Sequence, residues 1–111
     1  MQDPNGIAVV ITTVSTAEEA ESLAKALVEQ SLAACVQIDG PVTSHYRWEG
    51  KLERTLEFRL MIKTSRKAWP AVHEKLLSLH SFDEPEILML VAADFGEGYR
   101  NWVLDQTDIE N

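Results

Sequence analysis

The sequence lacks several features, and each absence excludes a class of protein. Its 111 residues include one cysteine, Cys35, so no intrachain disulfide and no cysteine-based zinc site can form. Lys and Arg number only 10 against 18 Asp and Glu, and this net charge of -8 argues against nucleic acids and anionic membranes as partners. The longest apolar run, residues 87–93, is far short of the roughly 20 residues that a membrane-spanning helix needs.

Signals of targeting and of catalysis are missing as well. Residues 1–6 have no basic segment of the kind that opens a secretory signal, so we expect a cytoplasmic protein with a reduced thiol. The sequence contains no Gly-rich phosphate loop, no Gly-x-Ser-x-Gly elbow and no His-Glu-x-x-His helix. Because no pairing of nucleophile and base is visible, we expect that the protein is not an enzyme.

What is present indicates one globular domain over residues 1–111, with polar tails at 1–6 and 107–111. Hydrophobic residues make up 45% of the chain and charged residues 25%, the balance of an ordinary folded domain. The spacing of apolar residues switches between helical and strand periods along the chain. It predicts a strand at 7–11, a helix that follows Ser15 or Thr16 and ends near Ser31, a β pattern over 33–63, a helix at 67–80, a strand at 86–93 and a short helix at 98–106.

Local signals sharpen this outline. Ser15 with Glu18 and Thr16 with Glu19 both have the spacing of a capping box at the start of the first helix. Residues 56–63 alternate strictly between apolar and polar, and the Gly-bearing turn at 49–51 has the length that joins hairpin strands. Gly40-Pro41 interrupts the first arm of this hairpin, so we expect a break or a bulge there.

The element order predicts an α+β fold, a ferredoxin-like βαββαβ sandwich. It has a four-stranded antiparallel sheet, both main helices on one face, an extended hairpin and a short C-terminal helix. The strands are apolar on both sides, so the face without helices needs a cover, and we predict a homo-oligomer that uses the hairpin. The alternative is a monomer whose C-terminal segment folds over that face.

Few residues suggest chemistry. His73 and His80 are predicted on one face of the same helix, about 10 Å apart along its axis, too far to share a metal ion. His80 precedes Asp83, Glu84 and Glu86, and imidazole with carboxylates suits a divalent transition metal. The alternative is a histidine favoured by the helix dipole, followed by a solvated acidic loop.

Three other residues have open interpretations. Cys35 is interpreted as a small buried hydrophobe, with a nucleophile as the alternative. Glu57 and Lys63 stand on one side of a predicted strand, six residues apart. Charges on an interface of an oligomeric sheet are costly unless they are paired, so these two either pair across subunits or line a cleft.

Four segments together resemble the CutA divalent-cation tolerance family. They are Leu-Ala-Ala-Cys-Val at 32–36, Tyr-Arg-Trp-Glu-Gly-Lys at 46–51, Ile-Lys-Thr at 62–64 and Pro-Glu-Ile at 85–87. The likeness covers residues 7–102. It implies a ferredoxin-like subunit in a tight homotrimer built by pairing of the long hairpins, and a cytoplasmic role in tolerance of copper and other divalent ions. The trimer resembles that of the PII signalling proteins.

The resemblance also implies a set of site residues. His80 and Glu86 are the expected metal ligands. The expected cleft residues are Tyr46, Trp48, Glu57, Lys63 and Trp102. For Trp48 and Trp102 the alternative is plain packing between subunits.

The sequence departs from the family pattern at three positions. Thr12 replaces a cysteine that is a proposed copper ligand in some relatives, which weakens any preference for Cu(I). Ser81 and Phe82 replace the usual proline and tyrosine after the histidine, so one hydroxyl is lost from the expected cleft.

We therefore expect a divalent-cation tolerance protein that binds Cu(II) or another divalent cation, with no cofactor required for folding. The alternative is a PII-like trimer that binds a small molecule or a partner protein between its subunits.

Overall fold

The computed structural model describes residues 3–108, which form a four-stranded antiparallel sheet and three helices. The strands are β1 (Ile7–Val14), β2 (Cys35–Trp48), β3 (Lys51–Ser65) and β4 (Ile87–Val91), in the spatial order β2-β3-β1-β4. The helices are α1 (Ala17–Glu29), α2 (Trp69–Leu79) and α3 (Glu97–Gln106). The α+β class and the predicted element order are confirmed, and none of the described helices is long and apolar enough to cross a membrane.

The start of α1 agrees with one of its two predicted caps, whereas α2 begins at Trp69, two residues after the predicted start at 67. The Thr16 side chain accepts a hydrogen bond from the Glu19 backbone N–H at 3.1 Å and so caps the first turn of α1. Pro70 lies in the first turn of α2, where its missing N–H would have no partner within the helix.

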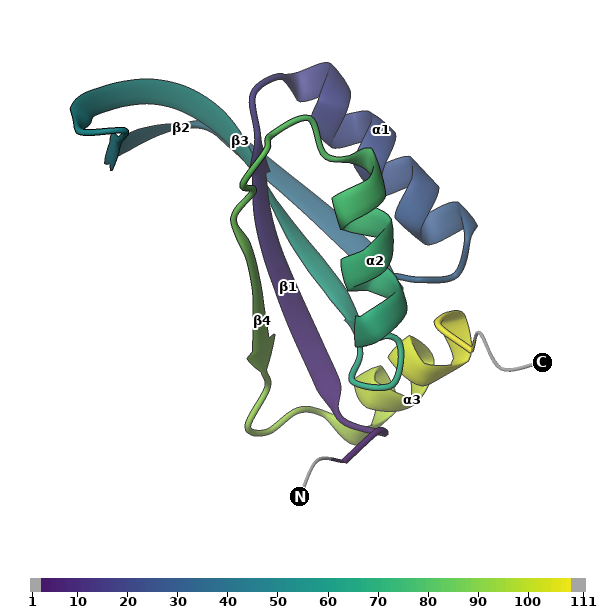
Figure 1. Cartoon of the computed structure of the whole chain (residues 1–111). Coiled ribbons are helices and arrows are strands. Elements are labelled where there is room, and N and C mark those ends of the chain that lie inside the picture. The colour runs from purple at the N-terminus through teal and green to yellow at the C-terminus, as the bar shows by residue number, and fades with distance from the viewer. Residues whose placement is uncertain (1–2, 109–111) are drawn as a thin grey trace.

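The hairpin of β2 and β3 is the longest feature of the fold. Its two-residue turn, Glu49 and Gly50, has positive φ at both positions (51° and 81°), the conformation that matches the twist of paired strands. The register shifts between Asp39 and Val42, so the bulge predicted at Gly40-Pro41 is confirmed. The outer part of the hairpin projects past the rest of the sheet, and the molecule measures 44 × 27 × 21 Å (Figure 1).

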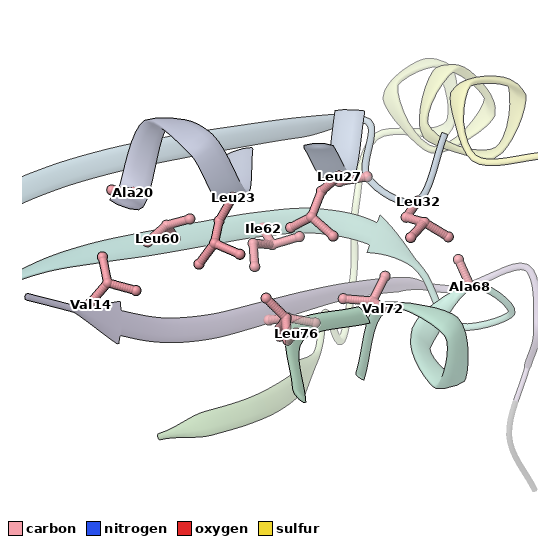
Figure 2. Packing of buried hydrophobic residues seen from close by; sticks show 12 residues of the cluster. Val14, Ala20, Leu23, Leu27, Leu32, Leu60, Ile62, Ala68, Val72 and Leu76 are labelled. Carbon is pink, nitrogen blue, oxygen red and sulfur yellow. The ribbon is translucent and has the colours of Figure 1, made fainter. Parts of the chain in front are cut away.

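The core lies between the sheet and the two helices that cover one face of it (Figures 1 and 2). Side chains from β1 and β3, such as Val10 and Ile62, meet side chains from α1 and α2, such as Leu27 and Leu76, and all four are fully buried. Alternation along the strands directs every second side chain to the other face. The side chains on that other face are therefore not covered by α1 and α2.

The face away from the helices is apolar and partly open. Val9 pairs with Leu90 and Ile11 with Leu88 across β1 and β4. Leu88 and Leu90 are about half exposed, at 50% and 51%. These exposed leucines agree with the apolar second face that the sequence predicts.

Gly6 and Thr107, which lie at the inner ends of the predicted tails, contact the rest of the domain. The Gly6 N–H donates to the Asp3 carbonyl, and the Arg66 N–H donates to the Gly6 carbonyl, both at 3.0 Å. Thr107 is buried, and its hydroxyl donates to the Val103 carbonyl at 2.7 Å. Local hydrogen bonds and packing thus tie these residues to the domain. The remaining tail positions, 1–2 and 109–111, lie outside the described residues.

Candidate functional site

A pocket of about 560 Å³ lies between the hairpin and the loop that joins α2 to β4. One wall comes from β2 and β3, and the other comes from loop residues 80–86 and the end of β1. The lining residues are Thr13, Ser44, His45, Tyr46, Trp48, Glu57, Phe82, Glu84 and Glu86.

His80 holds the loop wall in place. It is the residue after the last turn of α2, with an extended backbone (φ -71°, ψ 140°). Its Nδ1 atom accepts a hydrogen bond from the Phe82 N–H at 3.1 Å. Its Nε2 atom lies 2.9 Å from the Thr13 carbonyl oxygen and 3.1 Å from the Thr12 hydroxyl. The ring therefore connects the loop to the end of β1.

These contacts fix which nitrogen carries the proton. Because Nδ1 accepts from a backbone N–H, the neutral ring has its proton on Nε2, which donates to the Thr13 carbonyl. Both ring nitrogens of His80 are thus occupied, and a metal ion could bind this ring only by breaking one of the two bonds. His80 caps α2: its backbone N–H donates to the Leu76 carbonyl at 2.9 Å, and the chain leaves the helical path only after this residue. That His73 and His80 share a helical face stays a prediction.

The pocket is rich in carboxylates. Glu57 accepts a hydrogen bond from the Ser44 hydroxyl at 2.5 Å and is partly buried. Glu84 and Glu86 come from the loop and are exposed. Among the described residues that line the pocket there are three carboxylates and neither Lys nor Arg. The pocket therefore favours positive charge.

Arg59 is already paired with a carboxylate, that of Asp39. Arg59 donates to Asp39 through Nε at 3.2 Å and Nη2 at 2.7 Å. This hydrogen bond and the charge of Asp39 raise the pKa of Arg59, and the charge of Glu86 adds a smaller contribution in the same direction. The same hydrogen bond lowers the pKa of Asp39. Arg59 therefore neutralises Asp39 first and Glu86 only in small part.

Three aromatic rings accompany the carboxylates. Tyr46 and Trp48 line the pocket from β2 and keep 42% and 47% of their surface exposed. Phe82 lines it from the loop, and its ring lies 4.9 Å from the His80 ring at a tilt of 47°. The Thr55 hydroxyl donates to the Tyr46 hydroxyl at 3.4 Å.

Two predicted cleft residues lie elsewhere in the chain. Lys63 donates to Gln37 at 2.5 Å on the sheet and does not line the pocket. Trp102 lies on α3, where its ring is 5.8 Å from that of Tyr99. Within one chain, the structure brings together Tyr46, Trp48, Glu57 and Glu86, and it leaves Lys63 and Trp102 outside this group.

The described residues do not form a complete metal site. Within residues 3–108, no three His, Cys, Asp or Glu side chains lie close enough together to hold one metal ion. Thr12 is fully buried and its hydroxyl lies against His80. Cys35 is partly buried on β2 and has no disulfide partner. A resident metal therefore does not fit the ligands of a single chain.

Sequence reasoning missed part of the lining. Ser44 and His45 belong to the same strand as Tyr46 and Trp48, so the β pattern placed them near the site without assigning them to it. Thr13 joins the lining only because the loop after α2 folds back over the end of β1. The sequence carries no signal for that contact.

Comparisons with known proteins identify the family. The family model described as "CutA1 divalent ion tolerance protein" matches residues 8–106. The divalent-cation tolerance protein CutA of Thermus thermophilus is 41% identical over 99 residues, which cover 89% of this chain and 96% of that protein. Protein CutA of Mus musculus is 33% identical over 105 residues, and the match covers 95% of this chain but only 59% of the mouse protein.

A solved structure gives the same answer. The periplasmic divalent cation tolerance protein CutA of Archaeoglobus fulgidus superposes with a TM-score of 0.87 at 32% identity, covering 91% of this chain and 98% of that one. These relatives carry the name of a tolerance protein or of the family, and none is named for PII-type signalling. This chain therefore belongs to the CutA1 divalent ion tolerance protein family.

Proposed function

We propose that this protein is a cytoplasmic, non-enzymatic divalent-cation tolerance protein that works as a homotrimer of ferredoxin-like subunits. It binds a divalent cation such as Cu(II) at the carboxylates of the hairpin pocket. The observation that carries the proposal is the grouping of Glu57, Glu84 and Glu86 in one pocket lined by neither Lys nor Arg. Carboxylates attract divalent cations, and the net charge of -8 per chain adds to that attraction.

The candidate ligands of the cation differ in part from His80 and Glu86, the pair that the sequence predicts. Glu86 remains a candidate ligand, whereas His80 has both ring nitrogens in hydrogen bonds. His45 is the imidazole that lines the pocket, and it is exposed. Because no three candidate ligands come together in the part of the chain that the structure describes, the proposed site is completed by a residue of a neighbouring subunit.

The exposed apolar side chains support assembly. The hairpin carries Tyr46, Trp48, Leu52 and Leu56 at its surface, and the face away from the helices carries Leu88 and Leu90. Exposed apolar groups of this extent mark surfaces that bind another protein. A trimer in which the hairpins pair would cover them and bring new ligands to each pocket.

Calorimetric titration with Cu(II) tests the cation site. Glu86→Gln removes one pocket charge, and Glu21→Gln removes the same charge from the exposed surface of α1. We expect the first variant to weaken Cu(II) binding about tenfold, as loss of a charged ligand does, and the second to match the wild type. Equal weakening in both variants would mean that only the overall charge attracts the ion.

Two further measurements test the assembly and the location. Sedimentation equilibrium should give three times the chain mass of 12.5 kDa, and a monomer at micromolar concentration would reject the trimer. Fractionation of cells should place the protein in the cytoplasm. Because the Archaeoglobus relative is described as periplasmic, recovery in a periplasmic or extracellular fraction is the contrary result.

A further inference from the structure

We propose that Asn5-Gly6 is a site of spontaneous deamidation, assisted by the guanidinium of Arg100. The proposal is independent of the cation site, because it concerns the opposite end of the sheet. Asn5 lies just before β1, whose first residue Ile7 pairs with Ser65 at the end of β3, whereas the hairpin turn precedes the start of β3 (Figure 1). The site therefore lies apart from the outer part of the hairpin, which the proposed assembly covers.

The sequence singles out Asn5 among the asparagines. Of the three asparagines in the sequence, only Asn5 is followed by glycine. Deamidation begins when the backbone nitrogen of the next residue attacks the carbon of the side-chain amide, and glycine has no side chain that obstructs this approach. Asn5 is exposed, and its side-chain amide makes no hydrogen bond to any described residue. The amide is therefore free to turn toward the Gly6 nitrogen.

Arg100 of α3 lies where it assists this attack. Its Nη1 atom is 3.5 Å from the Asn5 carbonyl oxygen. The Gly6 nitrogen must lose its proton to become a nucleophile, and resonance in the peptide bond then spreads the negative charge onto that oxygen. A cation beside an oxygen that gains negative charge stabilises the charged state. Arg100 therefore favours the deprotonated peptide bond, which is the reactive form.

One backbone hydrogen bond opposes the reaction. The Gly6 N–H donates to the Asp3 carbonyl at 3.0 Å, and this bond must open before the nitrogen can attack. Residues 3–5 of this turn are exposed. Exposed segments with few buried contacts open at little cost in free energy. The opening of the turn thus slows the reaction without preventing it.

The reaction needs no co-reactant other than water. The Gly6 nitrogen gives its proton to water and bonds to the side-chain carbon of Asn5, and the side-chain nitrogen takes up a proton and leaves as ammonia. Water then opens the resulting succinimide ring at either carbonyl, which gives aspartate or isoaspartate. Nothing is oxidised or reduced. One water enters, one ammonia leaves, and the chain gains one negative charge.

The structure opposes the same ring closure at Asp39-Gly40. An aspartate before glycine can form the succinimide by loss of water, but both carboxylate oxygens of Asp39 are held by Arg59. Its Nε atom donates to Oδ1 at 3.2 Å and its Nη2 atom to Oδ2 at 2.7 Å. A charged carboxylate is a poor electrophile, and these two bonds hold it in place. Of the two positions, we therefore expect only Asn5 to react.

The test incubates the full-length protein at mildly alkaline pH and maps its peptides by mass spectrometry. We expect aspartate and isoaspartate at Asn5, one negative charge more than the -8 of the starting chain, and no change at Asn101 or Asp39. In Arg100→Gln we expect the reaction to slow by about two- to fivefold, the range of a partly exposed charge interaction. Arg47→Gln removes the same charge from the exposed hairpin and should react like the wild type.

Arg100 also lies 5.8 Å from the centre of the Phe95 ring, so the same proteins are compared a second time in urea. Once the chain is unfolded, Arg100→Gln and the wild type should deamidate at one rate, because Arg100 no longer lies beside the Asn5 carbonyl. Two results would overturn the proposal. One is an intact Asn5 in the folded protein under conditions where the unfolded chain reacts, and the other is an equal rate in folded Arg100→Gln and folded wild type.

Discussion

The His80 ring joins the loop wall of the pocket to the end of β1, and His80→Ala tests this role. The substitution removes the acceptor of the Phe82 N–H and the donor to the Thr13 carbonyl. It also removes the polar contact of the Thr12 hydroxyl, which is fully buried. We expect the loop wall of the pocket to detach from β1 and the fold to lose stability.

The size of the effect follows from these contacts. Two hydrogen bonds of ordinary net strength contribute about 1–3 kcal/mol together. Because the His80 ring is only partly buried, water replaces part of this loss. We therefore expect the free energy of unfolding to fall by about 2 kcal/mol.

Urea unfolding at one fixed protein concentration is the assay, since the stability of an assembling protein depends on concentration. The matched control is His73→Ala, which removes the same ring from an exposed position on α2. Its only described ring contact is a stack on Trp69 at 4.8 Å, so its effect should be smaller, about 0.5–1 kcal/mol.

One outcome would refute the interpretation of His80 as a loop anchor. If His80→Ala unfolds at the same urea concentration as the wild type but no longer binds Cu(II), then the ring is a metal ligand. If it is less stable while Cu(II) binding persists, the ring positions the loop and the cation site lies elsewhere in the pocket.

Two other predictions concern the hairpin. In Gly40→Ala, the new Cβ would lie 2.9 Å from the Phe58 ring, and the residue would keep a φ of +147° that side chains rarely adopt. We expect the free energy of unfolding, measured with urea, to fall by about 2 kcal/mol or more. In the control Gly98→Ala the new Cβ would have no atom within 4 Å, so the fold should not be destabilised. The hydrogen bond from Arg59 holds the pKa of Asp39 below its unfolded value of about 3.9. The pair therefore stabilises the fold above that pH, and this stabilisation is lost as the pH falls through the pKa of Asp39 in the folded protein. Asp39→Asn should therefore lose less stability than the wild type between about pH 5 and about pH 3, and parallel losses would contradict this assignment.

Local signals predicted much of the fold because they depend on neighbouring residues. The alternation over 56–63 gave β3, and Thr16 marked the start of α1. The bulge at Gly40-Pro41 followed from the missing N–H of proline. By contrast, β1 continues to Val14 because that residue pairs with Phe58. Strand ends of this kind are set by distant partners and are not visible in a local pattern.

The site was predictable where it depends on residue type and not where it depends on tertiary contacts. The resemblance pointed to Tyr46, Trp48 and Glu86, which do meet in one pocket. Imidazole chemistry predicts His80 as a metal ligand, but two of its three hydrogen-bonding partners lie 67 and 68 residues earlier in the chain. No spacing rule connects positions so far apart, and therefore its contact with Thr13 required the structure.

The central place of β1 has a consequence for the newly made chain. Of the four described strands β1 is synthesised first, yet it lies between β3 and β4, which come much later. At about 5–20 residues per second, synthesis from Ile7 to Val91 takes about 4–17 seconds. Until β3 is complete at Ser65, about 3–12 seconds after Ile7 at the same rate, this apolar, β-branched segment has no strand to pair with, and its second partner β4 follows later still. We therefore expect this segment to be where the nascent chain needs the help of a chaperone.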